Sequence, residues 1–475
     1  SMSDEPVVTS LLPEREAAYT RELGAMYQGD SSELLQELPE NSIDLIVTSP
    51  PFALQHEKEY GNEPLSEYND WFMENFAGEV QRVLQPHGSF ILEIGGTFKP
   101  GMPERSTYQF DLLSRLTDAD DPGFADRPDG LHLSQDVYWM NTAKLPSPVE
   151  WVNVRKFRIT DAVTPIWWLS KEINKEPART EETMRKLKLV ERVAAEVEPE
   201  PAADIVEAIL RGAPLSEDGK YYTSERKELI ETLLPDLADD IHNLIEASNK
   251  TPSVFARKVI AAVKASEEIP YPQPKPEANN QRALREYSES HKDLIETGEY
   301  NEGERPSGWN IGGDFGNDNN GAIPKNYIEA ANTASKTKYQ DFCKRYGFEK
   351  LRARFVPDVP EFFIKFLTPN PPYDDWDRGS FDRPVVLDIF GGSNITGSLA
   401  QELGRYWLTF EMDEEYIRNS ELRFMDQEEA EDRFGHRVED ENVADDENTV
   451  DDENIDDEEN TNLSSFDEEN TAMSN

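Results

Sequence analysis

Two short motifs hold the residues with the clearest chemical character, and the first is Ser49-Pro50-Pro51-Phe52. It follows an apolar run, IDLIVT, that predicts a buried strand. Consecutive prolines fix the backbone and lack N–H groups, so the Pro50 carbonyl becomes a rigid outward acceptor. An exocyclic amine could donate to this carbonyl and to the Ser49 hydroxyl while its ring stacks on Phe52. The motif therefore predicts a site for an aromatic amine; the alternative is a plain proline strand terminator.

The second motif, VVLDIFGGSNITG, lies at 385–397, near the other end of the chain. It predicts a strand ending at Asp388, a glycine turn through Gly391, and a helix whose positive end faces a ligand. Glu411 lies 23 residues beyond Asp388, at the end of the next predicted strand, where a carboxylate can bind ribose hydroxyls. The pattern indicates a nucleoside cofactor, with a plain glycine turn as the alternative. The Gly-x-Gly-x-x-Gly fingerprint is missing, which disfavours NAD.

Strands and helices alternate around both motifs, as in a doubly wound parallel sheet. On the N-terminal side we expect strands at 25–30, 43–48 and 89–94 and helices at 31–38 and 71–84. On the C-terminal side, EFFIKFL predicts a helix, and VVLDIF and YWLTFE predict strands. The sequence thus predicts one α/β sheet assembled from both ends of the chain.

The middle of the chain has a different composition. Three aromatic-rich short strands are expected at 133–140, 150–160 and 165–170. Four amphipathic helices follow, near 181–197, 202–212, 223–247 and 252–267, and the proline-dense segment 270–279 closes the region. We interpret 173–272 as a helical insertion. It is a candidate target-recognition element, and a passive elaboration is the alternative.

Length and composition restrict the class of protein. The 475 residues are enough for two or three domains, or for one α/β domain with insertions. Because no long apolar run and no secretory pattern are present, we expect a soluble intracellular protein. Cys343 is the only cysteine, which excludes an intramolecular disulfide and a cysteine-based zinc cluster. We predict no metal site.

The net charge of −48 is unusually negative. Residues 426–475 hold 21 acidic side chains against two arginines, and we expect them to form a disordered acidic tail. The remaining chain is also acidic. This favours the solvated surface of a protein from a high-salt cytoplasm, with an acidic interaction tail on an ordinary cytoplasmic protein as the alternative.

With these motifs in this order, the chain resembles the amino-directed DNA methyltransferases of the β class, and among them the cytosine-N4 enzymes related to the PvuII methylase. The resemblance covers about three quarters of residues 23–425 and includes IDLIVTSPPFAL, RVLQPHGSFILEIGG, RPSGWNIG and VLDIFGGSNITG. It implies a Rossmann-like sheet with circularly permuted motif order, S-adenosylmethionine as cofactor, and transfer of a methyl group to N4 of a flipped cytosine in duplex DNA. Adenine-N6 methylation and a non-catalytic DNA-binding protein of the same fold are the alternatives; Ser49, in place of Asp or Asn, favours cytosine. A cognate restriction endonuclease is a candidate partner.

The resemblance also implies roles for single residues. The catalytic group is Ser49, Pro50, Pro51 and Phe52. The cofactor group is Asp30, Phe355, Asp388, Phe390, Gly391, Ser393 and Glu411. Asp30 has an alternative role as a helix N-cap, and the segment around Phe355 departs from the pattern usual in the family.

Basic and aromatic residues suggest where DNA would be contacted. Arg155, Lys156 and Arg158 lie among aromatic residues in WVNVRKFRIT and are the main candidates for DNA contact. Residues 344–354 hold a second basic cluster. Solvated faces of ordinary structure are the alternative for both clusters.

These predictions divide the chain into five segments. They are an N-terminal arm (1–23), the catalytic half (24–172), the helical insertion (173–272), the cofactor-binding half (273–425) and the acidic tail (426–475).

Overall fold

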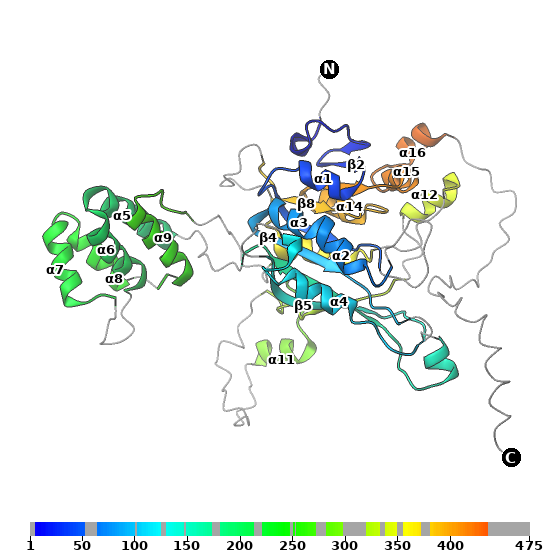
Figure 1. Cartoon of the computed structure of the whole chain (residues 1–475), viewed down its shortest axis with the longest axis horizontal. Coiled ribbons are helices and arrows are strands. Elements are labelled where there is room, and N and C mark those ends of the chain that lie inside the picture. The colour runs from blue at the N-terminus through cyan, green and yellow to red at the C-terminus, as the bar shows by residue number, and fades with distance from the viewer. Residues whose placement is uncertain are drawn as a thin grey trace, which may run out of the picture. The chain divides into compact units, whose positions relative to one another are not determined.

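The chain forms two compact units in a computed structural model: Ser1–Glu172 with Asn279–Asn475, and Ile173–Ala278 (Figure 1). The structure describes residues 5–52, 64–99, 102–124, 130–146, 149–172, 181–212, 221–247, 250–251, 253–271, 282–297, 320–332, 338–348, 355–371 and 381–435.

A mixed sheet forms the centre of the larger unit. Its described strands are β1 (Tyr19–Arg21), β2 (Gly24–Gln28), β3 (Ile43–Thr48), β4 (Leu84–Glu93), β5 (His132–Asn141), β6 (Val163–Ser170), β7 (Tyr327–Ala330), β8 (Val385–Asp388) and β9 (Tyr406–Glu411). They lie in the order β1-β2-β9-β8-β3-β4-β6-β5-β7. The run from β2 to β4 is parallel throughout, whereas β1 and β6 pair antiparallel with their neighbours. The predicted α/β fold with a parallel central sheet is confirmed.

Alternate side chains of the central strands enter two hydrophobic clusters because successive residues of a strand face opposite sides. Ile46 and Leu387 join the cluster that includes residues of α1 (Ser31–Glu37), α2 (Tyr68–Phe72), η2 (Met73–Ala77), α3 (Gly78–Val83) and α4 (Tyr108–Leu116). Leu45 and Val386 join the cluster that includes residues of α13 (Asp358–Leu367), α14 (Ile395–Glu402) and α15 (Glu414–Ser420). Helices therefore cover both faces of the sheet, as in doubly wound folds.

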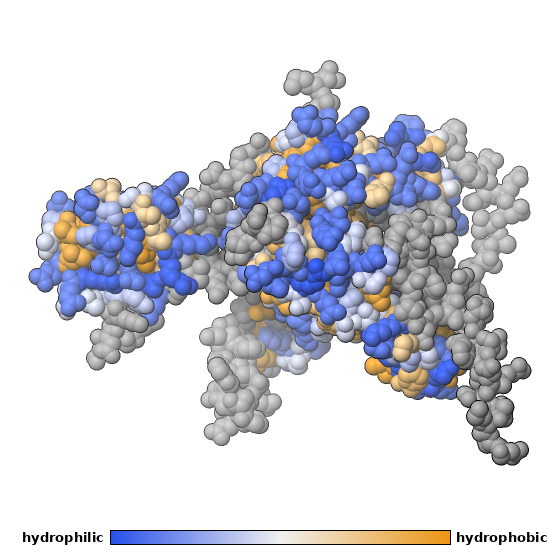
Figure 2. Space-filling model, in the orientation of Figure 1, coloured by the Kyte–Doolittle hydropathy of each residue, from blue (hydrophilic) through white to orange (hydrophobic). Residues whose placement is uncertain are grey.

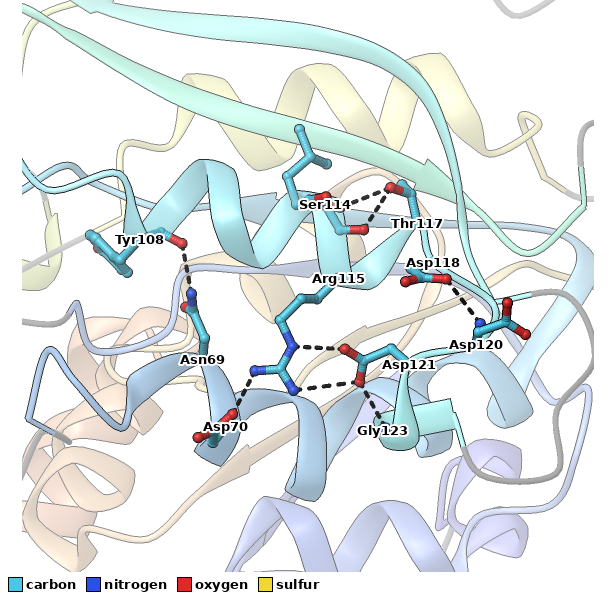
Figure 3. Close-up of polar contacts among 11 residues, drawn as sticks. Asn69, Asp70, Tyr108, Ser114, Arg115, Thr117, Asp118, Asp120, Asp121 and Gly123 are labelled. Carbon is cyan, nitrogen blue, oxygen red and sulfur yellow. Dashed lines mark hydrogen bonds and ion pairs between the residues drawn. The ribbon is translucent and has the colours of Figure 1, made fainter.

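The helix predicted at 71–84 forms as a continuous run of α2, η2 and α3, with η2 a π-helical turn. Arg115 of α4 fixes its position. The guanidinium donates to Asp70 at 2.7 Å through Nη1 and to Asp121 at 2.7 Å through Nε (Figure 3). The Asn69 amide donates to the Tyr108 carbonyl at 3.1 Å in the same interface. These contacts hold the helix that carries Trp71 and Phe76 toward the carboxyl edge of the sheet.

The N-terminal segment is part of the fold rather than an arm. Its described residues form η1 (Val7–Leu11) and β1. Val8, Leu11 and Leu12 are buried in the hydrophobic cluster that Ile46 and Leu387 join. The prediction of an arm over 1–23 is therefore wrong for residues 5–23. Apolar residues in this segment have a face of the sheet to pack on, which the local sequence does not reveal.

The strand predicted at 150–160 is also wrong. Residues Glu150–Val154 form η4, a single π-helical turn between β5 and β6. Its backbone is paired locally: the N–H of Arg155 donates to the carbonyl of Glu150 at 2.8 Å. The aromatic and β-branched composition predicted a strand, but no neighbouring strand pairs with this segment among the described residues.

The smaller unit is helical and has its own core. Its described helices are α5 (Glu181–Glu196), α6 (Pro199–Arg211), α7 (Ser224–Leu233), α8 (Ala238–Ala247) and α9 (Ser253–Ala265). The helix predicted at 223–247 is interrupted between α7 and α8, where Pro235 has no backbone N–H to donate. Ile209, Ile241 and Phe255 are among the buried residues of a cluster made only of this unit's side chains.

The predicted acidic tail begins with ordered structure. Residues Gln427–Phe434 form α16, which begins with a capping box between Asp426 and Glu429. Ala430 is buried together with Tyr339 and Cys343 of α12 (Lys338–Tyr346). Disorder was the wrong prediction for residues 426–435, and residues 436–475 lie outside the described part.

Three further described elements are η3 (Pro122–Phe124), α11 (Glu289–Thr297) and η6 (Glu421–Arg423). None of the helices in the described ranges is long and apolar enough to cross a membrane.

Candidate active site

The two sequence motifs meet at the carboxyl edge of the parallel strands. Strands β3 and β8 are neighbours, with Leu45 opposite Val386 and Ile46 opposite Leu387. Ser49 follows β3, Asp388 ends β8, and Glu411 ends the next strand, β9. Ligands of open α/β sheets bind at this edge. The structure therefore brings the two motifs to one site.

The Asp388 carboxylate links the two motifs directly. Its Oδ1 accepts from Thr48 Oγ1 at 2.7 Å, and its Oδ2 accepts from Thr396 Oγ1 at 2.8 Å. The N–H of Phe390 donates to Oδ1 at 3.1 Å. Burial raises the pKa of Asp388, and these donors oppose that rise. Asp388 thus fixes the end of β3 against the start of α14.

The glycine turn after β8 is packed closely against β9. A Cβ atom at Gly391 would lie 2.1 Å from Thr409 Cγ2, so only glycine fits there. Asn394 adopts a left-handed conformation with φ of 53° and caps α14 by accepting from the Gly397 N–H at 3.1 Å. Ser393 is buried, and its hydroxyl accepts from Arg423 Nη2 at 2.8 Å.

Glu411 is half-buried at the end of β9. Its Oε2 accepts from the Gly392 N–H at 2.7 Å, and its Oε1 accepts from the Met412 and Asp413 N–H groups at 2.9 and 3.0 Å. Burial raises the pKa of Glu411, and the three N–H donors act in the opposite direction. The carboxylate is thereby held in one orientation beside the glycine turn.

Asp30 lies at the neighbouring strand end. The Gly29 N–H donates to the Glu411 carbonyl at 3.0 Å, which places this turn beside β9. The exposed Asp30 carboxylate accepts from the Ser32 N–H at 2.8 Å and caps α1. The structure thus shows the N-cap role, at a position beside Glu411.

Aromatic residues of both motifs pack on the same cluster. The Phe390 ring centroid lies 5.1 Å from that of Phe76 and 6.2 Å from that of Trp71, and Phe52 also packs on this cluster. Phe355 packs against the other cluster, which includes residues of α13. The structure therefore does not group Phe355 with Phe52 and Phe390.

Sequence reasoning missed Glu93, the last residue of β4. Glu93 is buried, and its carboxylate hydrogen-bonds the Ser49 hydroxyl. Burial raises the pKa of Glu93 from 4.5 to about 7, while the Ser49 hydroxyl opposes the rise. The signal was present in SFILEI, where one acidic residue interrupts an apolar strand. Buried carboxylates with a raised pKa are frequent at functional sites.

The remaining residues of the first motif line the same edge. Pro50 is buried, whereas Ser49, Pro51 and Phe52 are half-buried. The Phe52 ring lies against Gly95, since a Cβ at Gly95 would be 2.5 Å from Phe52 Cε2. The Gly95 carbonyl accepts from the buried Tyr108 hydroxyl.

We expect Gly95→Ala to displace the Phe52 ring and to lower turnover by about tenfold, because small misplacements at a reacting centre cost one to two orders of magnitude. Steady-state turnover, with the thermal unfolding midpoint as control for the fold, measures the effect. Wild-type turnover in a folded Gly95→Ala variant would show that the position of Phe52 does not matter.

The predicted DNA-contacting residues lie around η4. Arg155 Nε donates to Glu150 Oε1 at 2.6 Å, and its guanidinium lies 5.3 Å from the Trp151 ring centroid. Lys156 is exposed, with φ of 57°, and Arg158 lies 5.0 Å from the Phe98 ring centroid. In the second basic cluster, Lys344 and Arg345 lie on α12, and residues 349–354 fall outside the described part.

A doubly wound sheet with a glycine turn and a held carboxylate at its carboxyl edge defines a Rossmann-like α/β protein. The sequence matches the DNA methylase family N6_N4_Mtase over residues 43–422. The chain belongs to this family.

The chain is similar to individual relatives and to a solved structure over different shares of their lengths. The chain is 35% identical over 419 residues to the type II methyltransferase M.PvuII of Proteus hauseri, which covers 88% of this chain and 89% of the relative. It is 30% identical over 127 residues to M.BamHI of Bacillus amyloliquefaciens, covering 26% and 28% of the two chains. A solved structure of the PvuII DNA methyltransferase (cytosine-N4-specific) is 30% identical, covers 88% of this chain and 93% of its own, and aligns with a TM-score of 0.49.

Proposed function

We propose that this protein transfers a methyl group from S-adenosylmethionine to N4 of cytosine in duplex DNA. Membership of the DNA methylase family and the similarity to M.PvuII over most of both chains support the proposal. The observation that carries it is the meeting of Ser49-Pro50-Pro51-Phe52 with Asp388 and Glu411 at one edge of the sheet. An amine site and a nucleoside site are adjacent there.

The donor set at this edge fits S-adenosylmethionine. Glu411 presents a half-buried carboxylate suited to ribose hydroxyls, and Asp30 lies at the adjacent strand end. Phe390, Gly391 and Ser393 would line the methionine end. When bound, the cofactor supplies an electrophilic methyl group.

The chain's own residues would orient the amine and remove its proton. Hydrogen bonds from N4–H to the Ser49 hydroxyl and the Pro50 carbonyl favour a tetrahedral nitrogen whose lone pair can attack. N4 becomes cationic as it gains the methyl group and must then lose one proton. Ser49 can accept this proton while passing its own to the Glu93 carboxylate. No covalent enzyme intermediate is needed.

Aromatic groups would support the same step. The Phe52 or Phe390 ring can stabilise the developing positive charge by about 1–2 kcal/mol when water is excluded. N4 is not reachable within a stacked duplex, so the cytosine must leave the helix at a cost of about a few kcal/mol. Stacking on Phe52 would recover part of this cost.

Product analysis tests the proposed reaction. DNA treated with the protein and S-adenosylmethionine is digested to nucleosides and analysed by mass spectrometry, with a reaction lacking the cofactor as control. We expect N4-methyldeoxycytidine. N6-methyldeoxyadenosine would show that the target base is adenine, and failure to bind the cofactor would support a non-catalytic DNA-binding protein.

Finer assignments complete the proposal. We propose a circularly permuted motif order, in which the catalytic motif precedes the cofactor motif along the chain. The compact helical unit is a candidate for target recognition. Arg155, Lys156 and Arg158 would contact DNA, and the protein would act in the cytoplasm, with a cognate restriction endonuclease as a candidate partner.

We also propose that the protein is adapted to high salt. At a net charge of −48, self-repulsion destabilises the folded state at low ionic strength, and salt screens it. We expect the thermal unfolding midpoint to rise by several degrees as KCl increases from the millimolar to the molar range. A midpoint that stays constant or falls would exclude the halophilic origin.

A further inference from the structure

The segment between β5 and β6, residues 142–162, extends beyond the sheet, and η4 lies near its tip (Figure 1). We call it the β5–β6 extension; the structure describes all of it except 147–148. Large apolar side chains near its end are exposed: Val154 is 61%, Phe157 56% and Ile159 88% accessible. Figure 2 shows hydrophobic and hydrophilic surface side by side at this end of the larger unit.

Local hydrogen bonds fix the conformation that exposes these side chains. The Trp151 carbonyl accepts from the N–H groups of Phe157 and Arg158 at 3.1 and 3.2 Å, which closes a tight loop. Lys156 within this loop has φ of 57°, a conformation that costs about 1–2 kcal/mol in most residues. The Trp151 and Phe157 ring centroids lie 5.6 Å apart. The loop is therefore preorganised, with its apolar side chains outward.

Exposure of these side chains is unfavourable unless a ligand covers them. Fully burying one Phe or Ile side chain is worth about 1.5–3 kcal/mol. Three large apolar side chains that are exposed within six residues and flanked by charged residues are a candidate interaction site. The extension therefore presents a binding surface.

The base of the extension is anchored beside the candidate active site. Two guanidinium groups contact the Phe98 ring, with Arg105 at 5.5 Å and Arg158 at 5.0 Å from its centroid. Arg105 Nη1 also donates to Asp161 Oδ2 at 2.7 Å. The guanidinium of Arg105 lies against Gly96, the residue after Gly95, which contacts Phe52. Direct packing contacts thus join the residues around Phe52 to the base of the extension.

The basic residues of the extension indicate which kind of ligand covers it. Arg155, Lys156 and Arg158 flank the apolar residues on a chain whose net charge is −48, so a polyanion is the complementary ligand. Resting on the proposed function, we propose that Phe157 and Ile159 insert into duplex DNA and stabilise the state in which the target base is extruded. Apolar side chains inserted between bases replace the stacking that the extruded base gives up. Arg155 and Lys156 contact phosphates beside the insertion point.

The test compares two double variants on one duplex. The duplex contains the sequence found by mapping modified cytosines in DNA treated with the enzyme, with 2-aminopurine beside the target. Phe157→Ala/Ile159→Ala is expected to reduce the fluorescence rise on binding and to lower turnover at least tenfold. Turnover should recover on a duplex with a mismatched target, because less unpairing is then required. The matched control Leu133→Ala, which truncates an exposed apolar residue at the opposite end of β5, should change neither quantity.

The double variant Arg155→Gln/Lys156→Gln tests the proposed phosphate contacts separately from the insertion of Phe157 and Ile159. It is expected to reduce the slope of log binding constant against log salt by about 2, since two phosphate contacts are lost. Fluorescence at saturating enzyme should stay at the wild-type level.

Three results would overturn the insertion. They are unchanged fluorescence and turnover in the apolar variant, no recovery on the mismatched duplex, and a wild-type dimer in sedimentation that the apolar substitutions dissociate. The last would make a second copy of the chain the occupant. Wild-type protein that yields no modified cytosine in the mapping would instead overturn the proposed function, so the two failures are distinguishable.

Discussion

Glu93→Gln is expected to lower methyl transfer by about 10²–10⁴-fold, the range that a positioned proton acceptor contributes. Glutamine keeps the shape of the side chain but cannot take the proton that Ser49 passes on. In the wild type, turnover should rise with pH around a midpoint of about 7, the pKa to which burial raises Glu93. The variant should lose this pH dependence. Single-turnover rates from pH 5 to 9 measure both effects.

Although Glu93→Gln lowers turnover, it is expected to increase the stability of the fold at neutral and higher pH. Because the folded-state pKa of Glu93 lies above its ordinary value of 4.5, ionisation at about 7 disfavours the folded state. Its contribution to stability is present below pH 4.5 and is lost as pH rises through 7. Relative to Glu93→Gln, the wild type should lose about 3 kcal/mol of unfolding free energy across this window.

Denaturant unfolding of both proteins at pH 5 and pH 8 checks the stability effect. Glu22→Gln, which neutralises an exposed carboxylate, serves as the matched control and should follow the wild type. A Glu93→Gln variant with wild-type turnover would remove Glu93 from the reaction. If the difference in unfolding free energy between the wild type and Glu93→Gln is the same at both pH values, the pKa of Glu93 is not raised in the folded state.

Ser49→Ala is expected to reduce turnover by about 10²-fold or more, because the N4 amine loses its acceptor and Glu93 loses its link to the amine. The dissociation constant of S-adenosylmethionine should change little, since the proposed cofactor residues lie on the other strand ends. Because Glu93 can then no longer receive the proton, the residual activity should lack the rise around pH 7 that Glu93 gives the wild type.

Turnover, cofactor titration and the pH profile of the residual activity are measured together. Ser10→Ala removes an exposed hydroxyl in η1 and should leave all three unchanged. Unchanged turnover in Ser49→Ala would exclude Ser49 from the mechanism. Weakened cofactor binding with unchanged turnover at saturation would move Ser49 into the cofactor site.

The strands of the central sheet were predictable because their apolar runs are unambiguous. IDLIVT, VVLDIF and YWLTFE each form the expected strand, at β3, β8 and β9. The prediction for 150–160 failed because β-branched and aromatic residues form a strand only where another strand pairs with them. The same residues here close a turn on themselves, and none of them is buried. The arm over 1–23 failed for a related reason, since its apolar residues pack on strands distant in sequence.

The sequence by itself determined the chemical types of the site: an amine acceptor in Ser49-Pro50-Pro51-Phe52, a glycine turn, and an acidic strand end at Glu411. These are local properties of residue type and order. Tertiary structure alone decided that Thr48 and Asp388 bond across the joined motifs and that Glu93 lies buried against Ser49. Strand order and burial set these contacts, and both depend on residues far apart in the chain. The raised pKa that would make Glu93 a proton acceptor follows from that burial.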